Sequence, residues 1–161
     1  MLTMEGARSL DVERARRAYE GVYAAGQNNA ISRKELGARL GELPAMLRSH
    51  GLGQTFAFCM AQSNRKNGGK VAKAYEATWK MLAQVLLPGP HCNDGSYPEQ
   101  EEVIQWLRNR DSRDDRRALT EALAYATWLK RWDEVLLAEG GAPASAKPSS
   151  SADEDGDKNA K

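Results

Sequence analysis

Residues 111–139 constrain the fold most, because this long stretch contains neither proline nor glycine. It is rich in Ala, Leu, Arg and Glu, which lose little side-chain freedom in a helix. Asp111 can cap the first turn, and Asp114 and Asp115 place negative charge at the positive end of the helix dipole. Such a helix extends roughly 43 Å, beyond the diameter of about 29 Å expected for a domain of this size. Other helices must therefore lie along it.

Apolar residues recur along this stretch with the helical period, and they cover more than half of its circumference. They are Leu119, Ala122, Leu123, Tyr125, Ala126, Trp128, Leu129, Trp132, Val135 and Leu136. So wide an apolar surface predicts neighbours on both sides. We therefore expect an all-α fold, a compact bundle of five to six helices with this long C-terminal helix as its spine.

The other helices follow from local signals. A first helix is expected over residues 9–25, with Val12, Ala15, Tyr19, Val22 and Tyr23 facing inward. Ser32 and Glu35 form a capping box that begins the second helix, and Pro44 should break or kink it. Further helices are expected over residues 54–62 and 70–87 and from Pro98 onward, with Val103, Trp106 and Leu107 inward.

The chain of 161 residues is long enough for one self-sufficient core. We expect a helical-bundle domain over residues 1–139, with residues 1–8 frayed. Residues 140–161 contain no large apolar side chain, so a disordered polar tail is predicted there. No apolar run approaches the ~20 residues that span a bilayer. Together with only two cysteines, this predicts a cytoplasmic protein with reduced thiols and no membrane contact.

Residues typical of catalytic or metal sites are few. No His and Cys stand at zinc-ligand spacing, and no cofactor or small-molecule substrate is predicted. His91 and Cys92 are adjacent and could act as base and nucleophile, but neighbouring side chains rarely reach one another and no third orienting group is evident. Cys59, inside an apolar segment, is expected in the core. The sequence therefore predicts that this protein is not an enzyme.

Two other features have a structural and a functional interpretation. Residues 51–55, GLGQT, could cradle a phosphate with free amides, but they lack the lysine of a P-loop and fit a tight corner between helices better. The four tryptophans have spacing typical of core packing rather than of platforms for base stacking. They are Trp79, Trp106, Trp128 and Trp132.

One local charge pattern departs from the net charge of +1. Residues 65–87 contain five basic residues and one acid, Glu76. On a helix, Lys70, Lys73 and Lys80 fall on one face, with Lys66 joining them if the helix extends that far, and Glu76 lies to one side. Such a stripe suits a phosphodiester backbone, although it would also serve as a solubilising face.

Three phrases resemble a known family, the small subunit of type III-B CRISPR effector complexes, the Cmr small subunit. They are ERARRAYE (13–20), LPAMLRSHGLGQTFAF (43–58) and EALAYATWLKRWDEVLL (121–137), of which the second is the most specific. Their order and separation are similar to that family across about residues 9–139. The resemblance implies an all-α bundle without nuclease activity.

In that family the small subunit stacks in several copies along the effector filament and lines the channel that holds target RNA, opposite the subunits that carry crRNA. The resemblance thus implies an antiviral role, with other Cmr subunits, further copies of this chain, crRNA and target RNA as partners. Our candidate RNA-binding residues are the basic residues of the matching phrases and of the lysine stripe. They are Arg14, Arg16, Arg17, Arg48, Lys70, Lys73, Lys80, Lys130 and Arg131.

Two hypotheses remain beside this one. A helical protein–protein adaptor without nucleic-acid contact would show no salt-dependent affinity for RNA. An enzyme that uses a thiol or an imidazole would depend on Cys92 or His91.

Overall fold

The computed structural model describes residues 4–89 and 91–138, and these two ranges contain helices and no strand. In chain order the helices are α1 (Met4–Gln27), α2 (Arg33–Ser63), α3 (Gly69–Leu86), α4 (His91–Asp94), α5 (Gln100–Arg108) and α6 (Ser112–Leu136). The predicted all-α fold is confirmed, with α4 amounting to a single turn. The predicted tail, residues 140–161, lies outside the described residues.

Local capping determines where two helices begin. Ser32 precedes α2, and its hydroxyl oxygen accepts a hydrogen bond from the Glu35 amide at 3.3 Å. Asp111 precedes α6, and its carboxylate accepts from the amides of Arg113 and Asp114 at 2.9 and 2.8 Å. Both predicted caps are confirmed, because each satisfies amides that have no partner inside the helix.

Helix α1 begins at Met4 rather than at Ser9, so it includes the backbone of residues 4–8. Gly6, the one glycine there, weakens a helix only modestly because it removes no hydrogen bond. The inward face of α1 also differs from the prediction. Its buried residues are Ala18, Gly21, Val22 and Ala25, and small residues at these positions let α1 approach its neighbours closely.

The helical backbone of α2 is interrupted at Gly51, whereas it continues through Pro44. Pro44 stands inside the helix and is buried together with Leu43 and Leu47, so packing offsets the one hydrogen bond that proline removes. Gly51 has φ 76° and ψ 176°, a conformation essentially confined to glycine. The Thr55 hydroxyl donates to the Gly51 carbonyl at 2.7 Å. The predicted corner at residues 51–53 is confirmed, and the predicted break at Pro44 is wrong.

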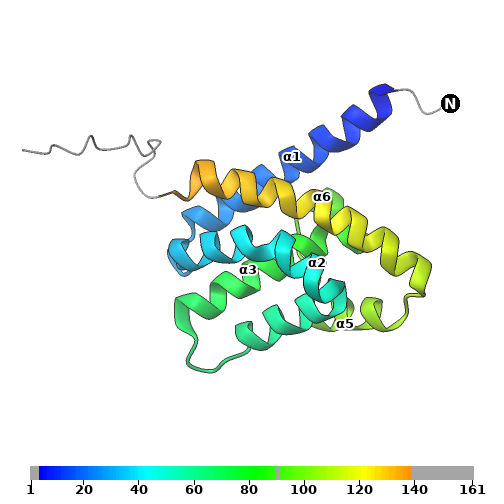
Figure 1. Cartoon of the computed structure of the whole chain (residues 1–161). Helices are drawn as coiled ribbons and strands as arrows, with labels where there is room; N and C mark the ends of the chain where they lie inside the picture. The colour runs from blue at the N-terminus through cyan, green and yellow to red at the C-terminus, as the bar shows by residue number, and fades with distance from the viewer. Residues whose placement is uncertain (1–3, 90, 139–161) are drawn as a thin grey trace, which may run out of the picture.

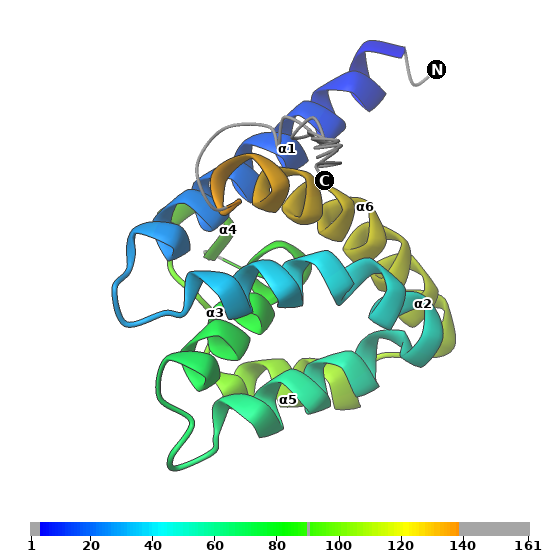
Figure 2. The same cartoon turned by 60° about the vertical axis from the view of Figure 1, so that its left-hand side comes forward.

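The helices form two sides around one core (Figures 1 and 2). Helices α1 and α6 lie together on one side, whereas the second half of α2, the start of α3 and α5 lie on the other. Helix α6 packs against α1, α2 and α3, so its predicted neighbours on both sides are confirmed. The largest fully buried side chains come from all of the longer helices: Val22, Leu36, Leu40, Leu43, Leu47, Leu52, Phe56, Met81, Leu82, Val103, Tyr125 and Leu129.

The four tryptophans pack as predicted. Trp79 is buried, and Trp106, Trp128 and Trp132 are half-buried against the core. In residues 4–89 and 91–138, no helix has both the length and the apolar character that crossing a membrane requires.

Candidate nucleic-acid interface

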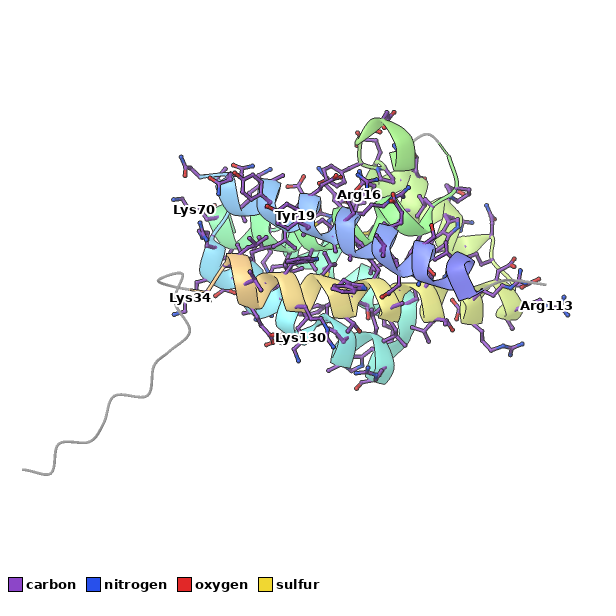
Figure 3. The ribbon with its side chains drawn as sticks, turned by 90° about the horizontal axis from the view of Figure 1, so that it is seen from above. Arg16, Tyr19, Lys34, Lys70, Arg113 and Lys130 are labelled. Atoms are coloured by element: carbon purple, nitrogen blue, oxygen red, sulfur yellow. The ribbon has the colours of Figure 1, made fainter. Side chains whose placement is uncertain are left out.

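The candidate RNA-binding residues do not converge on one surface (Figure 3). In this view from above, with α1 and α6 facing the viewer, Arg16 and Lys70 lie on one side of α6, and Lys130 lies on the other. Lys73 and Lys80 belong to the same helix as Lys70. The structure therefore presents at least two separate basic surfaces, one over α1 and α3 and one on the outer flank of α6.

Arg14 is part of an ion pair that joins α1 to α6. Its Nε donates to Glu121 Oε1 at 2.8 Å, and its Nη2 donates to Oε2 at 2.6 Å. The Arg14 side chain is only 24% exposed, and its hydrogen bonds hold the pKa of Glu121 below its usual value. A bidentate pair of this kind has a defined geometry, so Arg14 connects two helices in this structure.

Arg16 and Arg17 share carboxylates of their own helix. Glu13 Oε1 accepts from Arg16 Nη2 at 2.6 Å and from Arg17 Nε at 2.8 Å, and Glu20 accepts from Arg16 Nη1 at 2.6 Å. Hydrogen bonds from both arginines lower the pKa of Glu13 to about 2. Because these carboxylates offset the arginine charges, α1 offers a phosphate less positive charge than Arg14, Arg16 and Arg17 alone would suggest.

In the lysine stripe, Glu76 lies between two of the lysines and not to one side. Lys73 Nζ donates to Glu76 Oε2 at 2.9 Å, and Lys80 Nζ donates to Oε1 at 2.7 Å. Positions three and four residues apart share one face of a helix, which is why Glu76 reaches both. Burial raises the pKa of Glu76, but the two lysines outweigh it and the pKa is lowered. The triad retains a net charge of about +1.

Four candidate residues have no carboxylate partner among the described residues. The side chains of Arg48, Lys70, Lys130 and Arg131 are exposed, and none of them forms an ion pair in the described part of the chain. The Arg131 guanidinium lies 6.0 Å from the centre of the Trp128 ring, which keeps it close to the surface of α6. These residues are the strongest cationic candidates on geometric grounds.

Lys34 is a further exposed cation that the sequence interpretation did not select. Figure 3 shows Lys34 and Lys70 at the same end of the bundle, with Arg113 at the other end. The Ser32 amide donates to the Lys70 carbonyl at 3.1 Å, which joins the starts of α2 and α3. In the sequence, the only local indication of Lys34 as a candidate is the basic pair Arg33–Lys34 inside the capping box. The proximity of Lys34 to Lys70 depends on the contact between α2 and α3.

His91 does have oriented partners, contrary to the prediction. Its Nδ1 lies 2.7 Å from Ser96 Oγ, and its Nε2 lies 3.0 Å from Glu102 Oε2. Asp94 accepts hydrogen bonds from both the hydroxyl and the amide of Ser96, which lower the pKa of Asp94. The contacts tie the 91–96 segment to α5.

Cys59 is the one cysteine whose side chain the structure describes, and its thiol is not reactive. Cys59 is buried in the core as predicted, and burial raises the pKa of its thiol to about 12, far above the range in which thiolates form near neutral pH. The Cys92 side chain lies outside the described residues. Across the described ranges, no group of three or more His, Cys, Asp and Glu could hold a metal ion.

Several apolar residues of α1 are exposed although the helical period predicted them inward. Val12, Tyr19 and Tyr23 are 67%, 39% and 50% exposed. Tyr19 lies in the seam between α1 and α6 (Figure 3), with its ring 5.2 Å from Trp132 in an edge-on contact. Val135 of α6 is also exposed. This face is therefore apolar and aromatic, whereas Arg14, Arg16 and Arg17 of α1 are paired with carboxylates.

The Arg14–Glu121 pair leads to a prediction about stability. Replacing Glu121 with glutamine should lower the free energy of unfolding by about 1 kcal/mol, because a half-buried charged hydrogen bond is weakened. Glu20→Gln, which alters an exposed pair within α1, should have no measurable effect. Urea unfolding of the two variants would check this, and equal effects would contradict an inter-helical role for Arg14.

Comparisons with known proteins agree with the resemblance described above. The family described as CRISPR-associated protein (Cas_Cmr5) matches residues 10–136. The crystal structure of a CRISPR-associated Cmr5 family protein from Thermus thermophilus is similar, with 29% sequence identity and a TM-score of 0.59 over 78% of this chain and 96% of that chain. Curated protein sequences include no match. The chain belongs to the Cmr5 family, the small subunits of type III-B Cmr effector complexes.

Proposed function

We propose that this protein is a non-catalytic small subunit that stacks with further copies of itself along the cytoplasmic type III-B effector and lines the channel for target RNA in antiviral defence. The observation that carries the RNA contact is the set of exposed, unpaired cations in the described part of the chain, above all Lys70, Lys130 and Arg131. Lysine and arginine bind phosphates without reading sequence. Its partners are other Cmr subunits and the crRNA and target RNA of the complex.

The low net charge of +1 agrees with weak contacts that add up over several copies. A single subunit offers few free cations on either surface, so its own affinity for RNA should be low and sensitive to salt. When subunits are held side by side, each further contact becomes intramolecular and the affinities combine.

The exposed apolar residues support stacking. On the side formed by α1 and α6, Val12, Tyr23 and Val135 are exposed, and on the side formed by α2 and α3, Phe58 and Val71 are exposed. Figures 1 and 2 show the end of α2 and the start of α3 on the side of the bundle away from α1 and α6. A contact between two different surfaces repeats from copy to copy and generates a filament.

Charge-removing variants test the RNA contact. Lys70→Gln/Lys73→Gln/Lys80→Gln and Lys130→Gln/Arg131→Gln should each weaken binding of single-stranded RNA about fivefold. The dependence of log Kd on log salt should fall by about 0.7 for each phosphate that the variant no longer binds. Fluorescence anisotropy with the isolated protein, and retention of target RNA by the assembled complex, would measure both effects.

The control variant is Arg113→Gln/Arg116→Gln, which removes two exposed charges near the start of α6, the end of the bundle opposite Lys70. It should change the affinity less than twofold. If all three variants bind RNA alike, the assignment of the basic surfaces is wrong.

A protein-binding adaptor without nucleic-acid contact is the second candidate function. The ion pairs of Arg14, Arg16 and Arg17 and the exposed aromatic residues of α1 favour it. In that case, none of the charge-removing variants would change RNA retention, whereas Tyr23→Ser would weaken incorporation into the complex.

A further inference from the structure

A cleft of about 360 Å³ lies between the C-terminal half of α1 and the middle of α3. Its apolar lining comes from Ala24 and Ala25 of α1, Ala77 and Met81 of α3, and Ile31. The volume is within the range of small-ligand sites, about 300–1,000 Å³. Because alanine side chains end at Cβ, much of the lining is nearly flat, and a flat ring can pack against it.

The polar side of this cleft consists of Lys73, Glu76 and Lys80, the triad described above. Glu76 already accepts from both lysines, so its negative charge is offset. The Lys73 and Lys80 side chains are 57% and 32% exposed, and each ammonium group has three hydrogen-bond donors. Both can therefore donate to a phosphate at the rim while they retain Glu76.

Two further side chains of the lining can recognise a heterocycle. The backbone amide of Ala30 donates to Asn28 Oδ1 at 2.9 Å. The side-chain nitrogen of Asn28, Nδ2, therefore remains available to donate to a ligand. Tyr97 contributes an aromatic ring that is 37% exposed. Aromatic rings stack on any base without regard to sequence. The lining thus combines a flat apolar wall, an aromatic ring, an amide donor and two cations.

We propose that this cleft binds a single nucleobase, with the attached phosphate held by Lys73 and Lys80. This inference rests on the proposed RNA contact and extends it from the backbone to the base. The same chemistry fits an unstacked base of single-stranded RNA or a free mononucleotide. Sequence-tolerant stacking combined with cations is the general mode of single-strand binding.

Filling the cleft without changing charge provides the test. Ala24 is exposed on α1 and lines the cleft, so Ala24→Leu adds bulk there without disturbing the core. Alanine and leucine are both good helix formers. Ala45→Leu, at an exposed position of α2 outside the cleft lining, is the matched control.

The probes are adenosine 5′-monophosphate, a ten-nucleotide single-stranded RNA, and the same strand made of abasic nucleotides. Ala24→Leu should weaken binding of the RNA about fivefold and leave its salt dependence unchanged, because the phosphate contacts remain. Ala45→Leu should bind like the parent protein. With the abasic strand, the difference between the two variants should disappear.

The outcomes separate this inference from the proposed function. If Ala24→Leu binds both RNA and adenosine 5′-monophosphate like the parent while Lys73→Gln/Lys80→Gln binds RNA more weakly, the base-binding cleft is refuted and the RNA contact stands. If neither variant changes RNA binding, the base-binding cleft is refuted, and Lys130→Gln/Arg131→Gln decides whether the RNA contact stands. If adenosine 5′-monophosphate shifts the NMR signals of Ala77 and Tyr97 but Ala24→Leu affects only this probe, the occupant is a free mononucleotide.

Discussion

The Phe56→Ala variant is expected to lose about 3–5 kcal/mol of its free energy of unfolding. Phe56 is fully buried in the second half of α2, where it belongs to the core that α2 shares with α3 and α6. Truncation removes apolar surface from the core and leaves a cavity that rigid neighbouring helices fill only in part. The melting temperature should fall by about 10 °C or more. Urea unfolding and thermal melting followed by circular dichroism measure both quantities.

Phe58→Ala is the matched control, two positions further along the same helix. Phe58 is 41% exposed, and its ring contacts Tyr75 edge-on with the ring centres 5.8 Å apart. Its loss should lower the free energy of unfolding by about 1 kcal/mol. The same residue type is removed from the same helix, so the difference between the variants reports burial. Equal losses would contradict the rotation of α2 after the bend at Gly51.

Asp133→Asn is expected to raise the free energy of unfolding at pH 7.5 by about 1–2 kcal/mol. The Asp133 carboxylate of α6 packs against α2, so close that a Cβ added at Gly37 would lie 2.7 Å from its Oδ1. Burial, with repulsion from Glu134, raises the pKa of Asp133 from 3.8 to about 6. The full shift corresponds to about 3 kcal/mol, and partial exposure to solvent reduces the effect.

The sign of the change in stability with pH depends on whether the folded or the unfolded chain binds the Asp133 proton more tightly. Between pH 4 and pH 6 the folded protein keeps the Asp133 proton that the unfolded chain releases, so the stability contributed by this group falls as the pH rises through that window. The gain from Asp133→Asn should therefore be present at pH 7.5 and shrink towards pH 4. A gain that is equal at both pH values would show that ionisation of Asp133 is not its cause.

Glu134→Gln is a suitable control for this prediction. Glu134 is exposed, and its replacement removes only the repulsion that it exerts on Asp133. We expect a smaller gain in the same direction, measured by urea unfolding over the same pH range.

The candidate interface was predictable only as a list of residues. The basic residues are visible in the sequence, and the Glu76 contacts could have been inferred because their spacing is local. The Arg14–Glu121 pair joins residues 107 positions apart, and no local pattern indicates it. The cleft lined by Ala24, Ala77 and Tyr97 was likewise invisible, because three separate segments form it.

The sequence by itself determined the helical character of the chain and where two helices begin. Capping at Ser32 and Asp111 depends on side chains within one turn of the amides that they satisfy, so tertiary contacts are not required. The absence of proline and glycine from residues 111–139 likewise predicted the long helix α6.

Only the tertiary structure decided which side chains face the core and which cations stay free. Packing holds Pro44 inside α2, buries Phe56 while Phe58 stays exposed, and leaves Val12 and Tyr23 at the surface of α1. A helical period shows that a helix has an apolar side, but the rotation of each helix depends on the summed contacts with its neighbours. For the same reason, local sequence could not separate Lys130, which forms no ion pair within residues 4–89 and 91–138, from Arg14, which is paired across the bundle.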